Sequence, residues 1–316
     1  MFMSVSGKVI ADLVLKKELP EKPTVVELGN QTYSVDSNVI KQIVRDFENS
    51  DLKGSVDLEK LKELEGVKPA STPHESGVPH VSEFFKALGF ENYSAIDVNS
   101  NHKSLIMDLN ENIGQEYDFK KQFDLVTNMG VSEHIFNQGT FLKNAHYLTK
   151  KGGIMLHILP FNNYINHGFY NFQPRIFYDL ALANNYEILG SYMAEREGLL
   201  IDLLIPDENN TFFYQHLSSI TKNNAGNSFI VSVLRKNEDN EFTVPVQGKY
   251  HKDLEGDAVD TYRGQKLYQI ETPTKGLFVP PKTGKFEKIP QKIKRTVKKN
   301  ILEGLRKTSG FILKHF

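Results

Sequence analysis

The chain has 316 residues, of which 39% are hydrophobic and 24% are charged, and its formal net charge is −1. A chain of this length and composition can bury one large core or two smaller ones. Its 21 Phe and 13 Tyr exclude a chain that is disordered throughout, because burying so much aromatic surface offsets the entropy lost on folding. The absence of cysteine excludes a disulfide framework, a thiolate metal site and a cysteine nucleophile.

The sequence contains no segment typical of a secreted or membrane-spanning protein. Lys8 and Asp12 fall where a secretory signal would need uninterrupted apolar residues. A run of about 18 apolar residues, the length that spans a bilayer as a helix, does not occur. We therefore expect a cytoplasmic protein, with peripheral contact at the inner face of the membrane as the alternative.

Between residues 23 and 235, short runs rich in β-branched residues alternate with helical stretches, a pattern typical of βαβ units around a parallel sheet. The predicted strands are Thr24–Gly29, Tyr93–Val98, Ser104–Leu109, Phe123–Asn128, Gly153–Leu159, Tyr186–Met193 and Ser228–Lys236. The predicted helices are Ser37–Phe47, Val81–Leu88, Gly139–Leu148 and Pro174–Asn184. Together these elements predict an α/β fold with a doubly wound, mostly parallel, seven-stranded sheet.

Prolines and glycines divide the remaining chain. Residues 1–236 are expected to form the α/β domain, with an insertion at about residues 51–77 that Pro69 and Pro73 interrupt. After residue 236 the alternating pattern stops, and residues 237–281 are predicted to be an extended connector rich in Gly and Pro.

The last segment, residues 282–316, is strongly basic. It holds 11 Lys or Arg and 2 Asp or Glu, whereas the rest of the chain has a net charge of −10. The apolar residues that recur at every fourth position, and so predict an amphipathic helix, are Ile289, Ile293, Val297, Ile301 and Leu305. Two partners stay open for this helix, the acidic body of the same chain and an anionic membrane surface. Nucleic acid is disfavoured, because no aromatic residues interleave with the stripe to stack on bases.

Polar residues end the predicted strands, and ligands of doubly wound sheets bind beyond the carboxyl ends of strands, where the strand order reverses. The first strand ends in Glu27 and Gly29, and a glycine lets the backbone approach a ligand closely. The second ends in Asp97, a carboxylate suited to accept hydrogen bonds from ribose hydroxyls. The third ends near Asp108, which can accept from an exocyclic amine, and the fourth ends in Asn128.

These strand ends, together with Phe-Asp-Leu-Val-Thr-Asn at residues 123–128 and Ser-Glu-His at residues 132–134, resemble a class I S-adenosylmethionine-dependent methyltransferase. The similarity covers roughly residues 23–236 and includes the final strand pair. It implies S-adenosyl-L-methionine as the cofactor. The implied cofactor-binding residues are Glu27 and Gly29 at the methionine end, Asn30 and Gln31 in the turn that follows, Asp97 and Val98 at the ribose, Asp108 and Leu109 at the adenine, and Asn128 and Met129 beside the sulfonium.

Other nucleotide ligands fit the sequence less well. The single glycine after the first strand disfavours NAD, whose pyrophosphate needs a multi-glycine turn. A P-loop for ATP is excluded, because Gly-x-x-x-x-Gly-Lys-Ser/Thr follows no predicted strand. Two alternatives stay open: a methyltransferase for a small molecule or lipid, and a non-catalytic binding protein on the same fold.

Methylation of an alcohol also requires a proton to be removed, and histidine is the natural base near neutral pH. The candidates are His134, His157 and His167, and we favour His167 because it lies in an irregular loop. That loop, Pro160–Pro174, resembles the acceptor-binding loop of methyltransferases associated with bacterial glycan modification, which implies a sugar or glycan hydroxyl as acceptor. No metal is expected, because no carboxylate cluster beyond Glu133 is found near the fourth and fifth strands.

Overall fold

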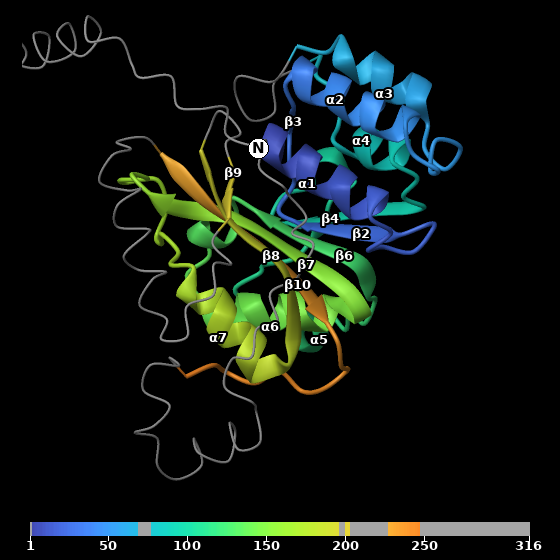
Figure 1. The fold of residues 1–316 in the computed structure, drawn as a ribbon. Coiled ribbons are helices and arrows are strands. Elements are labelled where there is room, and N and C mark those ends of the chain that lie inside the picture. The colour runs from blue at the N-terminus through green and yellow to red at the C-terminus, as the bar shows by residue number, and fades with distance from the viewer. Residues whose placement is uncertain (1, 69–76, 196–199, 203–226, 247–316) are drawn as a thin grey trace, which may run out of the picture. The chain divides into compact units, whose positions relative to one another are not determined.

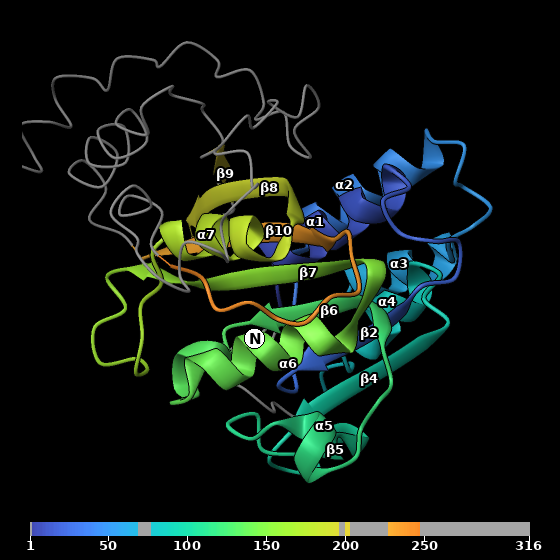
Figure 2. The same cartoon turned by 90° about the horizontal axis from the view of Figure 1, so that it is seen from below.

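The computed structural model describes residues 2–68, 77–195, 200–202 and 227–246. In these residues a mixed sheet lies between two groups of helices, as Figure 1 shows and as Figure 2 shows from below. The strands of this sheet are β2 (Thr24–Leu28), β4 (Asn92–Asp97), β5 (Leu105–Ile106), β6 (Phe123–Met129), β7 (Thr149–Asn162), β8 (Tyr186–Glu195), β9 (Leu200–Asp202) and β10 (Ser228–Lys236). Two further strands, β1 (Phe2–Met3) and β3 (Tyr33–Ser34), form a separate parallel pair.

The strand order is β5-β4-β2-β6-β7-β10-β8-β9. Strands β5, β4, β2, β6 and β7 run parallel to one another, whereas β10 is antiparallel to both β7 and β8. The order reverses between β2 and β6, because the chain first moves outward from β2 to β4 and β5 and then returns to β6. The predicted doubly wound, mostly parallel sheet is confirmed, and β9 extends it by one antiparallel strand beyond the seven predicted.

The helices in the described residues are α1 (Ser4–Leu15), α2 (Ser37–Glu48), α3 (Leu58–Glu65), α4 (Ser82–Ala87), α5 (Ile113–Glu116), α6 (Gln138–Leu148) and α7 (Arg175–Asn184). Polar side chains fix the beginnings of several of them. Asp36 accepts a hydrogen bond from the Asn38 backbone at the start of α2, and Asn137 accepts one from the Thr140 backbone at the start of α6. These side chains satisfy backbone N–H groups that have no partner within the helix.

Each face of the sheet packs against its own hydrophobic core. Side chains alternate between the faces along a strand, so Val25 and Leu125 pack with α1 to α4, while Val26 and Val126 pack with α5 to α7. Burial on both faces explains why the central strands read as continuous apolar runs in the sequence.

The outer elements differ from the sequence prediction. The predicted strand Ser104–Leu109 is reduced to β5, which pairs only with β4 in the described sheet and leaves Ile106 61% exposed. The helices α1, α3 and α5 were not predicted. Half of the residues of helix α1 are poor helix formers, namely three Val, two Ser and one Gly. The helix is stabilised by packing, with Gly7 against Val35 and Phe84.

Parts of the predicted domain organisation fall outside the described residues. The insertion expected at about residues 51–77 contains α3 where the structure describes it. Most of the connector predicted for 237–281 and all of the basic helix predicted for 282–316 lie outside the described residues. Among the helices that are described, none is long and apolar enough to cross a membrane.

Candidate functional site

The turn after β2 requires a glycine. Gly29 has φ +85°, in the left-handed region, and a Cβ on it would lie 2.4 Å from Cγ2 of Val131. Its amide donates a hydrogen bond to the carbonyl oxygen of Ile96 at 2.7 Å. Since Val131 lies just beyond β6, the missing side chain allows the ends of β2 and β6 to meet where the strand order reverses.

Asp97, the last residue of β4, is tied to this turn by hydrogen bonds. Its Oδ2 accepts from the Asn30 backbone at 2.8 Å, and its Oδ1 accepts from the Asn99 side chain at 2.7 Å. The Asn30 side chain in turn donates to Ser104 Oγ at 2.9 Å and lies 3.3 Å from His80 Nε2. The half-buried Asp97 carboxylate and the turn therefore form one hydrogen-bonded unit.

Glu27 is fully buried within β2. The Tyr93 hydroxyl donates to its Oε2 at 2.5 Å, while its Oε1 has no hydrogen-bond partner in the described part of the chain. Burial raises the pKa of Glu27 from 4.5 to about 8, because the ionised carboxylate loses its hydration. The carboxyl is therefore mostly protonated at neutral pH, and a nearby positive charge would favour its ionisation.

The unfolding free energy of the wild type should fall as the pH rises from 5 to 8, and we expect Glu27→Gln to reduce this fall. In this window the folded protein holds a proton on Glu27 that the unfolded chain has released, so the wild type loses up to about 1.4 kcal/mol of unfolding free energy per pH unit. The neutral amide carries no such penalty. Urea unfolding at pH 5, 6.5 and 8 measures the difference, with Glu91→Gln at an exposed glutamate as the control. The same pH dependence in all three proteins would contradict the effect.

The remaining cofactor residues predicted near β2, β4 and β5 differ in environment. Asp108 Oδ1 accepts hydrogen bonds from the backbone and side chain of Asn110 at 2.8 and 2.9 Å. Leu109 is buried in the core, and Gln31 is buried with its Oε1 unpaired within the described structure. Val98 is 66% exposed at the end of β4. Asp108 and Val98 are thus accessible, whereas Leu109 and Gln31 support the fold around them.

Asn128 belongs to a buried network that joins β6 to β7. Its amide nitrogen donates to Ser132 Oγ at 2.9 Å and to His157 Nδ1 at 3.1 Å, and its Oδ1 accepts from the Ser132 backbone at 3.1 Å. His157 Nδ1 is therefore the acceptor, which places the proton of the neutral ring on Nε2. Burial lowers the pKa of His157 to about 4. Met129, the last residue of β6, is also buried.

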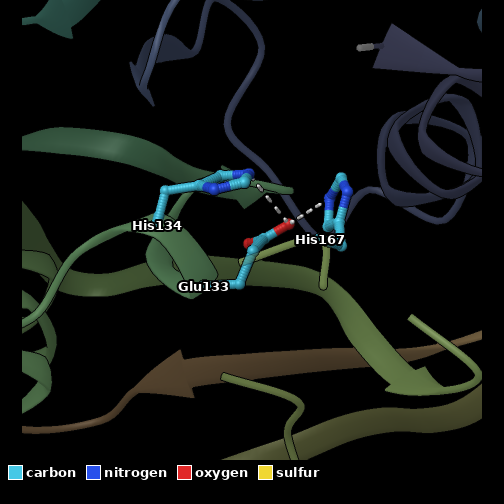
Figure 3. Close-up of side chains that lie close together, drawn as sticks. All are labelled: Glu133, His134 and His167. Atoms are coloured by element: carbon cyan, nitrogen blue, oxygen red, sulfur yellow. Dashed lines mark ion pairs between the residues drawn. The ribbon is translucent and has the colours of Figure 1, made fainter. Parts of the chain in front are cut away.

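The other two predicted histidines meet around Glu133, as Figure 3 shows. Glu133 Oε1 lies 3.9 Å from His134 Nε2 and 3.6 Å from His167 Nε2. Glu133 and His134 belong to a single helical turn, Ser132–His134, and His167 comes from the loop between β7 and α7. Glu133 is 1% exposed, and burial raises its pKa to about 7. We call these three residues the Glu-His cluster.

Sequence reasoning missed two side chains that support the site. Tyr93 is the hydrogen-bond partner of Glu27, and Ser132 completes the network of Asn128. The signal for Ser132 is its position in the Ser-Glu-His segment, directly before Glu133 and His134. Tyr93 lies on the neighbouring strand, and its contact with Glu27 depends on the register between β2 and β4, which the sequence does not reveal.

The strand order, with β10 reversed between β7 and β8, is that of a doubly wound, mostly parallel Rossmann-like sheet. No protein-family model matches the sequence, and no curated protein matches it. Several solved structures to which the chain is similar are described as methyltransferases.

Three of these structures illustrate the similarity. The 1,6-didemethyltoxoflavin-N1-methyltransferase of Burkholderia thailandensis, bound to 1,6-didemethyltoxoflavin and S-adenosylhomocysteine, is 13% identical with a TM-score of 0.39, over 74% of this chain and 79% of that one. An O-methyltransferase from a trans-AT PKS multienzyme of Brevibacillus brevis, with S-adenosylhomocysteine, is 11% identical with a TM-score of 0.36, over 72% and 71%. A methyltransferase of Thiobacillus denitrificans, also with S-adenosylhomocysteine, is 13% identical with a TM-score of 0.33, over 73% and 90%. At these identities and scores the likeness does not extend from fold to activity.

Proposed function

We propose that the protein is an S-adenosylmethionine-dependent methyltransferase that methylates a hydroxyl group of a sugar or glycan. The observation that carries the proposal is the hydrogen-bonded unit of Asp97 and the turn at Gly29, which lies where the strand order reverses. In doubly wound sheets this is the position at which ligands bind. The Asp97 carboxylate can accept hydrogen bonds from ribose hydroxyls, and the backbone at Gly29 lets a ligand approach closely. The turn lacks the several glycines that bind a phosphate group, which S-adenosylmethionine does not have.

The residues at the neighbouring strand ends would hold the other parts of the cofactor. The buried carboxyl of Glu27 and the turn at Gly29 suit the methionine end, because its ammonium group would stabilise the ionised carboxylate. Asp108 would accept from the adenine amine. Asn128 and Met129 would border the sulfonium, whose methyl group is the electrophile.

The Glu-His cluster would face the acceptor. His167 is our candidate base, because its side chain is 45% exposed, whereas His157 is buried and already accepts a hydrogen bond from Asn128. S-adenosylmethionine would supply the methyl group, which the hydroxyl oxygen would accept with S-adenosylhomocysteine as the leaving group, and His167 would take the hydroxyl proton. The loop that carries His167 also supplies aromatic surface, since the Tyr164 ring lies 5.3 Å from the His167 ring.

A small molecule with an apolar ring is the second candidate acceptor, and an exposed aromatic pair favours it. Phe136 and Phe169 are 71% and 65% exposed, and their rings meet edge to face with centroids 5.8 Å apart. Phe136 lies two residues after His134 and Phe169 two residues after His167, and the Phe169 amide donates to the carbonyl oxygen of Glu133, so the pair lies beside the Glu-His cluster. Comparing turnover on sugars and on aromatic alcohols separates the two acceptor classes.

For the segment 282–316 we propose contact with an anionic membrane surface, where a lipid-linked acceptor would be met. The proposal rests on the basic, periodically apolar sequence of the segment. The alternative partner is the acidic body of the same chain. Co-sedimentation with anionic vesicles, comparing the full chain with a chain that ends at residue 281, distinguishes the two.

Titration calorimetry with S-adenosylmethionine and S-adenosylhomocysteine tests the proposed cofactor. We expect micromolar dissociation constants, about −8 kcal/mol, and a weakening of roughly 10-fold or more in Asp97→Asn, because one charge-assisted hydrogen bond contributes about 1.5–3 kcal/mol. Asp118→Asn is the matched control, since Asp118 is exposed and pairs only with Lys120 among the ion pairs of the described residues. Absence of binding by the wild type to either compound would contradict the cofactor and favour the non-catalytic alternative.

A further inference from the structure

The three side chains of the Glu-His cluster bring their ligand atoms close together. Oε1 of Glu133 and one ring nitrogen from each of His134 and His167 all lie within 4.8 Å of one another (Figure 3). We propose that this cluster binds a divalent first-row transition metal ion, with Zn²⁺ as the probe. The proposal departs from the expectation, drawn from the sequence, that no metal is bound.

The distances fit ligation better than hydrogen bonding. Separations of 3.6 and 3.9 Å between Glu133 Oε1 and the two imidazole nitrogens exceed the 2.7–2.9 Å of a charge-assisted hydrogen bond. A Zn²⁺ ion with bonds of about 2.0–2.2 Å holds neighbouring ligand atoms roughly 3.4 Å apart in tetrahedral geometry. These two separations are therefore close to those that an ion bound between the three ligand atoms would impose.

The burial of Glu133 is the second, independent observation. The residue is 1% exposed, and its Oε2 makes no hydrogen bond within the described structure. A buried carboxylate oxygen without a hydrogen bond is costly, and proteins compensate buried charged groups by pairing them or by coordinating a metal ion. In the described structure neither histidine lies close enough to form a hydrogen bond with it.

Backbone contacts hold the two segments of the cluster together. The carbonyl oxygen of Glu133 accepts hydrogen bonds from the Phe169 and Tyr170 amides at 2.7 and 3.3 Å. Gly168 packs so closely that a Cβ there would lie 2.7 Å from the same carbonyl oxygen. The loop that carries His167 is thus fixed directly on Glu133, and the ligand atoms are brought together before any ion arrives.

The donor set selects the kind of ion. Two imidazoles and one carboxylate suit zinc and neighbouring transition metals, whereas Mg²⁺ and Ca²⁺ prefer oxygen ligands alone. The imidazole side chains are 48% and 45% exposed, which provides an entry path. Three protein ligands also leave a coordination position open, as in catalytic zinc sites.

Metal binding is independent of the proposed function. If that function holds, the open coordination position could also bind the acceptor. A hydroxyl of the acceptor bound there would lose its proton to water more readily, because the ion stabilises the alkoxide. His167 would then act as a ligand and not as the base.

The proposal is tested by titrating Zn²⁺ into the metal-stripped full chain and measuring the heat of binding by calorimetry. We expect one site of micromolar or tighter affinity in the wild type, weakened roughly 100-fold or more in His134→Ala and in His167→Ala. Glu133→Gln should weaken it as well. His80→Ala, which removes a histidine outside the cluster, should bind Zn²⁺ as the wild type does. Substituting Co²⁺ adds a spectroscopic signature, because ligation by the cluster produces visible absorption bands that the His134→Ala variant should lose.

Zinc binding of equal affinity and stoichiometry in the wild type and in a His134→Ala/His167→Ala double variant would overturn the proposal, and so would the absence of a tight site in the wild type. Both histidines are half-exposed, so their replacement should leave the fold intact, and thermal unfolding verifies this. Titration of the same samples with S-adenosylhomocysteine reports on the proposed cofactor separately. Failure of the metal site and failure of the proposed function are therefore distinguishable.

Discussion

Gly29→Ala should abolish measurable binding of S-adenosylmethionine and lower the unfolding free energy by about 2–4 kcal/mol. The left-handed φ of +85° costs an alanine about 1–2 kcal/mol. The added Cβ would also overlap Cγ2 of Val131 at 2.4 Å, so the ends of β2 and β6 would have to separate. Urea unfolding and titration calorimetry measure the two effects.

Gly152→Ala is the matched control for this substitution. Gly152 has φ +79°, but a Cβ there would meet no atom within 4 Å, so this variant bears the backbone strain alone. Adding Val131→Ala to Gly29→Ala should restore part of the lost stability, because it removes the overlapping methyl groups. If Gly29→Ala and Gly152→Ala lose the same stability and the cofactor still binds, the contact between Gly29 and Val131 does not shape the site.

His167→Ala should reduce turnover on an alcohol acceptor about 100-fold or more while the dissociation constant for S-adenosylmethionine stays unchanged. Removing general-base assistance typically has this size, and the proposed cofactor contacts lie on other residues. Steady-state kinetics together with calorimetry separate the effect on turnover from that on cofactor binding. Turnover of the variant is also measured with added Zn²⁺. Recovery of turnover at high Zn²⁺ would show that the variant lost activity because it lost a zinc ligand.

His157→Ala provides the comparison for the base assignment. His157 is buried, hydrogen-bonded to Asn128 and packed with its ring centroid 5.0 Å from that of Phe177, so its loss should lower thermal stability as well. A fall in turnover on replacement of His157 alone would move the base to that residue. Unchanged turnover in both variants would remove histidine from the role of base.

The central strands were predictable because they are buried on both faces and so are apolar at every position, as Val25, Val26, Leu125 and Val126 illustrate. The edge strand β5 is short and exposed, so its apolar sequence suggested a longer strand than the two residues that pair. Helix α1 was missed because its stability comes from packing and not from the helix propensity of its residues.

The candidate site was predictable only where position along one strand was enough. Gly29 directly follows β2 and Asp97 ends β4, and that alone suggested their place at the carboxyl-end edge of the sheet. The bond between Asn128 and His157 depends on the register of β6 against β7, where these two residues lie opposite each other. The approach of His167 to Glu133 depends on how a loop folds back, which no local pattern encodes.

The reversed strand β10 has a consequence for the order in which the protein can fold. Among the described strands β10 is the last to be synthesised. It nevertheless lies inside the sheet, between β7 and β8, and forms hydrogen bonds with both. As the chain leaves the ribosome, β2, β4, β5, β6 and β7 can pair in turn, but β7 keeps an open edge until residues 228–236 emerge. Until then β8 lacks the partner that joins it to the sheet, and the open edge of β7 offers a template for pairing with other chains. We therefore expect nascent chains halted before residue 228 to aggregate more readily than the full chain.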